Sequence, residues 1–384
     1  MFSYFLNLLK LARNDRHLHP RVAIFYVTGQ CNLNCAYCED FGTRRNTDND
    51  APLPVEQAMR VLGVLRRGVE AVMLTGGETL THPEIDQLVV RAKRELKFRE
   101  VTLITNGLLL HQHEAALSAV DRLIVSLDSP DPQAWSRIIG VSPAAAGTIL
   151  DNIRHYAGEQ DRFGYKMVVN AVLTPETLAT ADALLDFCLE QGRRREPGER
   201  RSLKGERRSL KGERRSLKGE RRSPLLISFS PQSFNNWPRY ELMVSPDYRA
   251  FIQKLIRLKR QGGPILASRR TLQTLLDFIP YDCYPALAPR VLANGDLTYP
   301  CRPFEKAANG QGGRAVNLLD VPGWAEAWKI ADQTYGRPPR TCHSCFQQCY
   351  IEPSLMQSRP LTLAWEWLRY PAVRRGDLTT YAPG

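Results

Sequence analysis

The chain has 384 residues, of which 43% are hydrophobic and 24% charged, a composition that is typical of globular proteins and excludes fibrous and wholly disordered ones. Its net charge of +12 comes mainly from residues 193–222, where 14 Lys and Arg residues stand against 5 Asp and Glu residues, so general binding of nucleic acid is not favoured. No apolar run is long enough to span a bilayer, and residues 1–11 lack a basic segment and a cleavage site. We therefore expect neither membrane insertion nor export, and a cytoplasmic protein.

The first predicted element is an amphipathic helix within residues 1–20. Phe2, Phe5, Leu8, Leu9 and Ala12 recur at helical spacing and form one apolar stripe. Such a stripe packs against the body of a protein more often than it binds a membrane. Packing is therefore our expectation, and peripheral membrane contact is the less favoured alternative.

Residues 21–240 alternate between short apolar runs and helical patterns. This alternation predicts an α/β fold with a parallel sheet, because each connection must return over the sheet in a right-handed sense. Six strands favour a partial (β/α)6 barrel over a closed eight-stranded barrel. The predicted strands are 22–27, 71–74, 101–105, 123–127, 166–172 and 225–230, and the predicted helices are 54–66, 83–97, 111–119, 144–157 and 175–191.

A basic repeat at residues 193–223 interrupts this pattern. Three heptads, beginning at Gly198, Gly205 and Gly212, read GERRSLK, and a fourth breaks off as GERRSP. A glycine in every heptad disfavours a helix, and one Leu per heptad cannot form a coiled-coil seam. We expect a solvated surface insertion, with an arm that binds RNA or membrane as the alternative.

Polar and glycine-rich motifs follow the first four predicted strands. CNLNCAYC at 31–38 follows the first strand, GGE at 76–78 the second, TNG at 105–107 the third and SLD at 126–128 the fourth. Because the carboxyl ends of parallel strands meet at one edge of a sheet, these motifs should form one site. Taken alone, the C-x3-C-x2-C spacing of Cys31, Cys35 and Cys38 also suits zinc or a redox motif.

In this order the motifs resemble those of the radical S-adenosylmethionine (SAM) enzymes, over about residues 21–240. The resemblance implies that Cys31, Cys35 and Cys38 hold three irons of a 4Fe–4S cluster and leave the fourth iron to SAM. In the family, the reduced cluster cleaves SAM to methionine and a 5′-deoxyadenosyl radical, which abstracts hydrogen from a substrate. A flavodoxin or ferredoxin type protein is the implied electron donor.

The resemblance also implies which residues bind SAM. Glu78 would receive the SAM ammonium, and Gly76 and Gly77 would let the backbone approach the ligand closely. Ser126 and Asp128 match positions that contact the ribose or carboxylate of SAM in relatives. The other implied cofactor-binding residues are Tyr37, Asn106 and the weaker match Asn170.

Five further cysteines lie within residues 280–350. Asn294-Gly295 predicts a hairpin turn between the first two, and residues 317–330 read as a short amphipathic helix before the last three. This pattern resembles the SPASM/Twitch extension of radical SAM enzymes, a small α+β domain. The resemblance implies an auxiliary 4Fe–4S cluster, and its candidate ligands are Cys283, Cys301, Cys342 and Cys345, with Cys349 either replacing one of them or remaining a spare thiol.

Zinc is the main alternative at these C-terminal cysteines, because two separated pairs also suit a zinc ribbon. His343 lies between Cys342 and Cys345 and is expected to be an exposed loop residue rather than a ligand. Cys188 stands alone in an apolar helical pattern, where we expect a buried structural thiol. Residues 241–279 are expected to form bridging helices. The tail at 351–384 contains an apolar stripe with Trp365, Trp367 and Tyr370 that we expect to pack.

Three functions fit this sequence. The favoured one is a radical SAM enzyme that acts on a small molecule such as a sugar, cyclitol or similar metabolite. The second is a maturase that modifies a peptide, which the short segment before the first strand disfavours. The third is a non-catalytic iron–sulfur or zinc protein, which the intact cysteine triad and GGE motif disfavour. The pattern does not indicate which substrate is bound.

Overall fold

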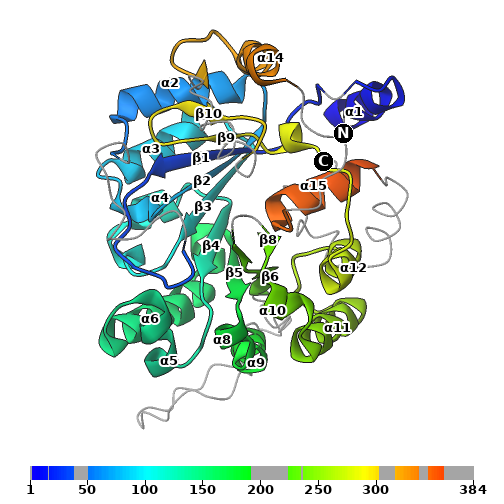
Figure 1. Cartoon of the computed structure of the whole chain (residues 1–384). Coiled ribbons are helices and arrows are strands. Elements are labelled where there is room, and N and C mark those ends of the chain that lie inside the picture. Colours follow the sequence, from blue (N-terminus) through cyan, green and yellow to red (C-terminus); the bar gives the residue numbers. More distant parts are fainter. Residues whose placement is uncertain are drawn as a thin grey trace, which may run out of the picture.

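The computed structural model describes residues 2–15, 17–38, 51–191, 224–234, 237–301, 316–336 and 345–358 (Figure 1). The basic repeat, the tail beyond residue 358, Cys342 and His343 lie outside the described residues. Helices and strands alternate along the core as predicted, and the chain forms an α/β fold built on one large sheet.

The sheet has the order β11-β10-β9-β1-β2-β3-β4-β5-β6, and β1 to β6 pair in parallel. Most residues of these strands are buried, which explains why the strands read as apolar runs. The six parallel strands match their predictions to within two residues at each end. They are β1 Ala23–Thr28, β2 Ala71–Gly76, β3 Glu100–Thr105, β4 Arg122–Ser126, β5 Lys166–Leu173 and β6 Leu226–Pro231.

Helices connect successive strands and cover the outer side of the curved sheet, as Figure 1 shows for α2, α3, α4, α6 and α9. Two predicted helices are each divided in the structure. The backbone of His113 is not helical, so residues 111–119 form η3 and α4; the Thr174 capping box starts a separate short helix before α9. The bounds are α2 Val55–Arg66, η2 Thr79–Thr81, α3 Ile85–Arg94, η3 Leu110–Gln112, α4 Glu114–Leu117, α5 Pro132–Ile139, α6 Pro143–Gly158, α7 Gln160–Phe163, α8 Pro175–Leu178 and α9 Ala181–Gln191.

The chain leaves the parallel core through a small ribbon and the predicted bridging helices. The ribbon pairs β7 with β8 in antiparallel fashion. Ser245 and Ser268 cap the two longer helices by accepting hydrogen bonds from backbone N–H groups of their first turns. The elements are β7 Ser233–Phe234, β8 Trp237–Pro238, α10 Tyr240–Met243, α11 Pro246–Arg260 and α12 Arg269–Asp277.

The predicted C-terminal hairpin joins the core sheet. Gly295 has φ of +89° at its turn, the backbone conformation that favours glycine. β9 pairs with β10 in antiparallel fashion and with β1 in parallel, so the hairpin extends the sheet beyond β1 (Figure 1). The elements here are η4 Pro285–Leu287, β9 Arg290–Val291, β10 Asp296–Thr298 and β11 Val316–Asn317.

The helix predicted at 317–330 begins later than expected. Residues 316–317 belong to β11, and the helix α14 is Trp324–Tyr335. The side chain of Asn317 bonds to Asn294 and Asp296 of the hairpin, which holds its backbone extended. The last helix, α15 (Gln348–Ser358), had no strong sequence signal because its hydrophobic residues do not follow one face.

The N-terminal helix forms as α1 (Phe2–Ala12), but it does not bury the predicted stripe. Phe5 and Leu9 are 55% and 57% exposed, whereas Tyr4 and Asn7 are buried. Tyr4 donates a hydrogen bond to the carbonyl of Met356 on α15, and the Asn7 amide donates to the carbonyl of His19. These polar contacts set the rotation of the helix, so the expectation that the stripe packs is wrong for Phe5 and Leu9.

No helix among the described residues has both the length and the apolar character needed to cross a membrane.

Candidate functional site

The first three cysteines lie on the loop that follows β1. Two backbone hydrogen bonds fix this loop to the end of α5, from Asn34 N to the carbonyl of Ile139 (3.0 Å) and from Ala36 N to the carbonyl of Ile138 (2.8 Å). Cys31, Cys35 and Cys38 line a cavity of about 200 Å³. The predicted motif therefore presents three thiols to one space.

The donor set of this loop suits a metal cluster. Burial raises the pKa of Cys31 to about 11 and raises the pKa of Cys35 further, and nearby acidic groups act in the same direction. The Cys31 and Cys35 thiols are therefore neutral in the metal-free chain, and binding of iron must release their protons. Three such sulfur ligands on one short loop match the donor set of a 4Fe–4S cluster with one open iron.

Gly76 and Gly77 bring the second strand end against the cysteine loop. Gly77 N donates to the carbonyl of Thr28 (3.0 Å), and Glu78 N donates to the carbonyl of Gln30 (2.8 Å). A Cβ at Gly77 would lie 2.3 Å from the Gln30 carbonyl oxygen, and a Cβ at Gly76 would lie 2.2 Å from that of Thr28. In the structure, the backbone that Gly76 and Gly77 approach closely is that of Thr28 and Gln30 in the same chain.

Gly77→Ala is expected to destabilise the chain by about 2–3 kcal/mol, because neither backbone can move freely away from the added Cβ. Gly63 on α2 provides the matched control, since a Cβ there meets nothing within 4 Å. Gly63→Ala should stabilise the chain by up to about 1 kcal/mol through the helix preference for alanine. Urea unfolding measures both changes, and equal effects at the two positions would contradict this account of Gly77.

Glu78 is 2% exposed and lines the same cavity. Its carboxylate accepts hydrogen bonds from Thr105 Oγ1 (2.7 Å), Asn106 N (2.6 Å) and Leu80 N (2.9 Å). Burial raises its pKa, and these donors oppose that change. Two carboxylate oxygens accept about four hydrogen bonds, so about one acceptor position is left for a cation in the cavity.

The third and fourth strand ends complete the cavity wall. Asn106 and Ser126 both line the cavity. The Asn106 side chain is already held in place, because its amide donates to Asn32 Oδ1 (2.7 Å) and its oxygen accepts from Leu108 N (3.0 Å). Asn32 therefore joins the site as a residue that the motif pattern did not single out.

Asp128 closes the cavity from the end of β4. Tyr37 donates a hydrogen bond to Asp128 Oδ2 (2.6 Å), and Val172 N donates to Oδ1 (2.8 Å). Burial raises the pKa of Asp128 to about 6, against the effect of these donors. Tyr37 thus connects the cysteine loop to the fourth strand end, and both predicted residues lie at the cavity.

This pKa predicts how stability changes with pH. A carboxyl group whose pKa is raised from 3.8 to about 6 by folding stabilises the native state below about pH 4, and that contribution is lost as the pH rises through 6. Its size is about 3 kcal/mol. Asp128→Asn stays neutral and can keep both partners, because the Tyr37 hydroxyl can accept as well as donate.

The metal-free Asp128→Asn chain should therefore gain about 3 kcal/mol relative to the metal-free parent between pH 4 and pH 7. Urea unfolding at pH 4, 5, 6 and 7 measures the difference between the two. If the free energies of unfolding of the two chains change with pH in the same way, Asp128 does not titrate in this range.

A second cavity of about 390 Å³ adjoins the first, and Tyr37, Cys38 and Ile104 line both. Asn170 on β5 lines the second cavity and not the first, which separates it from the other predicted SAM-binding residues. Among the described residues, none that lines the second cavity is Asp, Glu, Lys, Arg or His. Its polar lining consists of Asn170, Ser228, Ser230, Gln232, Ser233, Gln347 and Gln348, together with Tyr37, Cys38 and Cys349.

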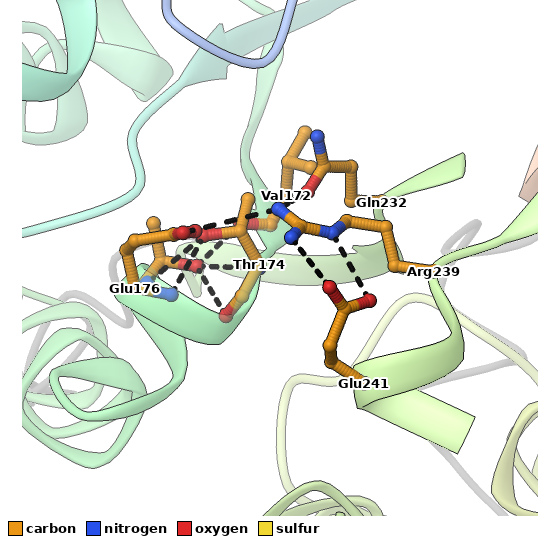
Figure 2. Close-up of polar contacts among 7 residues, drawn as sticks. Val172, Thr174, Glu176, Gln232, Arg239 and Glu241 are labelled. Carbon is orange, nitrogen blue, oxygen red and sulfur yellow. Dashed lines mark hydrogen bonds and ion pairs between the residues drawn. The ribbon is translucent and has the colours of Figure 1, made fainter. Parts of the chain in front are cut away.

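The side chain of Gln232, in the wall of the second cavity, is oriented by an ion-pair network around Arg239, which Figure 2 shows. Arg239 donates to Gln232 Oε1 (3.2 Å) and to Glu241 (2.9 Å), and it lies 3.8 Å from Glu176. Two carboxylates therefore neutralise the guanidinium. With its oxygen engaged, Gln232 has its Nε2 amide without a hydrogen-bond partner among the described residues and available to a molecule in the cavity.

Cys345 and Cys349 lie at or just before the start of α15, near Cys301. Cys283, Cys301 and Cys345 are buried, while Cys349 is partly exposed and lines the second cavity. Cys301 and Cys349 both act electrostatically on Cys345, whose pKa burial raises to about 12. Within the described part of the chain, no three His, Cys, Asp or Glu side chains lie close enough to hold a single metal ion.

Cys188 is fully buried on α9, and burial raises its pKa to about 12. The expectation of a buried structural thiol is confirmed.

Several cavity residues were absent from the sequence prediction. Ser228 and Ser230 alternate with apolar residues on β6, a period of two that would have marked one polar face of that strand. Gln347 and Gln348 adjoin Cys349 in sequence, but nothing local indicates that they meet β5 and β6. Gln348 contacts β6, where it accepts a hydrogen bond from Ser228 (2.6 Å).

Comparison with known proteins identifies the same family, over a shorter range than the predicted residues 21–240. A family model described as the radical SAM superfamily matches residues 25–188. The chain is 28% identical over 172 residues to a probable GTP 3′,8-cyclase of Methanococcus aeolicus, covering 43% of this chain and 54% of that protein. It is 36% identical over 124 residues to one of Methanothermobacter thermautotrophicus (32% and 40%) and 33% identical over 172 residues to the GTP 3′,8-cyclase of Mycobacterium marinum (43% and 46%). The chain thus spans about half the length of these curated relatives.

The fold is also similar to that of solved structures. The crystal structure of Streptococcus suis SuiB bound to S-adenosylmethionine aligns with a TM-score of 0.56 and 19% identity, over 83% of this chain and 68% of that one. SuiB bound to its precursor peptide SuiA aligns with the same TM-score and 20% identity, over 84% and 67% of the two chains. At this identity the likeness establishes the fold alone.

Proposed function

We propose that this chain, whose residues 25–188 match the radical SAM superfamily, is a radical SAM enzyme that abstracts hydrogen from a neutral small molecule. In this proposal, Cys31, Cys35 and Cys38 hold its 4Fe–4S cluster. The observation that carries the proposal is the pair of adjoining cavities that share Tyr37 and Cys38. The first cavity has the ligands for cluster and SAM, and the second has room for a substrate beside them.

When bound, the cluster supplies the electron that cleaves SAM to methionine and the 5′-deoxyadenosyl radical. The chain's own residues bind SAM and orient it in the first cavity. Glu78 offers its remaining acceptor position to the SAM ammonium, and its three internal donors keep the carboxylate aimed at the cavity. Asp128 and Ser126 lie at the same wall and are the proposed partners for the ribose or carboxylate of SAM.

The uncharged lining of the second cavity favours a neutral substrate that carries hydroxyl or amide groups, such as a sugar or cyclitol. Asn170, Gln232 and Ser230 supply neutral donors and acceptors. A ligand with several negative charges would need cations in a buried site, and the described lining has none. Arg239 reaches the wall, but Glu241 and Glu176 already neutralise its charge.

The relatives named GTP 3′,8-cyclase supply the second candidate, a nucleoside triphosphate. Their similarity covers at most 43% of this chain, and the wall that contains Ser228, Gln232 and Gln347 lies beyond the matched residues 25–188. Peptides are the third candidate, because SuiB has been solved with a precursor peptide. The uncharged lining of the second cavity therefore favours the neutral small molecule over GTP. The size of the molecule that donates the hydrogen distinguishes a small substrate from a peptide.

A labelling experiment tests the substrate class while the substrate itself is still unidentified. Metabolites from cells grown on deuterated medium are divided by size and by anion exchange, and each fraction is incubated with reduced enzyme and unlabelled SAM. The neutral small-molecule fraction should give 5′-deoxyadenosine that is one mass unit heavier, since the abstracted atom is deuterium. Transfer only from the anionic fraction would favour GTP or a similar substrate, and transfer only from the large fraction would favour a peptide.

The proposal includes an auxiliary 4Fe–4S cluster at the C-terminal cysteines. Protein reconstituted without oxygen should hold about eight irons per chain, and Cys342→Ala/Cys345→Ala should hold about four. One zinc and about four irons per chain would favour the zinc ribbon instead.

A further inference from the structure

The guanidinium of Arg290 is buried beside the C-terminal cysteines. Arg290 lies on β9 and is 5% exposed. One terminal nitrogen donates to Tyr26 Oη (3.1 Å), and the other donates to Gln347 Oε1 (2.6 Å) and to Cys349 Sγ (2.9 Å). The group also lies over the ring of Tyr350, 4.7 Å from its centroid.

None of these contacts is with a carboxylate that would compensate the positive charge of Arg290. Among the described residues its partners are a phenol, an amide, an aromatic ring and a thiol, and its Nε atom has no partner. Elsewhere in the interior, Arg122 is paired with Glu100 at 3.2 Å. A buried cation is normally retained only where an anion compensates it, so the neutral contacts account for its orientation and not for its charge.

The sulfur atoms are the anions that this position can meet. Cys349 is in direct contact with the guanidinium, and Arg290 acts electrostatically on Cys345 as well. An iron–sulfur cluster with Cys ligands is held by thiolates, and its potential depends on its net charge and on hydrogen bonds to its sulfurs. Cys349 also lines the second cavity, so it faces the proposed substrate on one side and Arg290 on the other.

We propose that Arg290 is the internal counter-cation of the auxiliary 4Fe–4S cluster and that Cys349, to whose sulfur it donates, is a ligand of that cluster. The inference rests on the auxiliary cluster of the proposed function. It makes Arg290 a positioning residue with two effects. The N–H···S bond orients Cys349, and the positive charge favours the reduced, more negative state of the cluster, which raises its reduction potential.

The test uses the full chain with Cys31→Ala/Cys35→Ala/Cys38→Ala as the parent, because only the auxiliary cluster then remains. Redox titration followed by electron paramagnetic resonance measures its potential. In Arg290→Gln the reduced-to-oxidised ratio at a fixed potential should fall at least tenfold, which equals about 59 mV for one electron. Arg290→Lys should retain most of the parent potential because it retains the charge.

Gln347→Glu tests the same idea without removing Arg290, and so without risking an unfilled space in the core. The new carboxylate would lie within hydrogen-bond distance of the guanidinium and compensate it, so the potential should again fall. Arg239→Gln is the matched control, since Glu241 and Glu176 already neutralise that arginine. The reduction potential of the auxiliary cluster in Arg239→Gln should equal that in the parent.

Cys349→Ala tests the ligand assignment. We expect a loss of iron or a changed resonance signal in this variant, whereas Cys188→Ala should keep both. Unchanged iron, signal and potential in Cys349→Ala and Arg290→Gln would overturn the inference. Zinc in place of iron in the parent would also overturn it, while SAM cleavage by the chain with its first three cysteines intact would still support the proposed radical chemistry.

Discussion

Replacing Cys31, Cys35 and Cys38 together by alanine should remove about four irons per chain and reduce reductive SAM cleavage to background. The three thiols line the same cavity as Glu78 and Asp128. Within the described residues the other cysteines lie at the C-terminal group or alone at Cys188, so no remaining set presents an open iron to this cavity. The loss of SAM cleavage should therefore be complete rather than partial.

Iron analysis and the amount of 5′-deoxyadenosine formed with dithionite measure these two effects. Cys188→Ala is the matched control, because it removes a buried thiol that is packed among apolar residues of α9. It should keep both iron and activity at a cost in stability of about 1 kcal/mol. Undiminished 5′-deoxyadenosine formation in the triple variant would refute the assignment of the cluster.

Glu78→Gln should weaken SAM binding by roughly 1.5–3 kcal/mol, or about 10- to 150-fold, because it removes the charge that the ammonium would meet. The structure adds a second effect. A glutamine has one acceptor oxygen where the carboxylate has two, and backbone N–H groups of Leu80 and Asn106 point at opposite oxygens. Either orientation of the amide leaves one of them unpaired, so stability should fall by about 1–3 kcal/mol.

Titration of SAM into the reduced protein, followed by electron paramagnetic resonance, measures the first effect, and urea unfolding measures the second. The cluster itself should persist, because Glu78 is not among its proposed ligands. Asp128→Asn should lose less SAM affinity, since an amide oxygen can still accept a hydrogen bond from a ribose hydroxyl. A Glu78→Gln protein that unfolds more readily but binds SAM normally would restrict Glu78 to its structural role.

The parallel core was predictable because its signals are local. Each strand is a short apolar run, and each motif begins where such a run ends, as at Thr28 and Gly76. The parallel sheet followed from the alternation of strands and helices and from the right-handed sense of the connections. The same reasoning placed Cys31, Glu78 and Asp128 at one cavity, as the structure shows.

What the sequence did not reveal depends on contacts between distant segments. The apolar stripe of α1 predicted a buried face, yet hydrogen bonds of Tyr4 and Asn7 to residues 356 and 19 turn Phe5 and Leu9 outward. The role of Gly77 likewise follows from the backbone of Gln30, which no local pattern indicates. The charge-free wall of the second cavity unites β5, β6 and the start of α15, which are far apart in the chain.

The pairing of β9 with β1 ties two distant parts of the chain into one cooperative unit. Ile24 N donates to the carbonyl of Pro289, and Arg21 N donates to that of Leu287, so the strand that leads into the cysteine loop has a neighbour on both sides. Cutting the chain before residue 280 would turn β1 into an exposed edge strand with unpaired N–H and C=O groups. Such edges recruit other chains and promote aggregation. The C-terminal segment thus protects the strand that leads into the cysteine loop, and a shortened chain should aggregate before its chemistry can be measured.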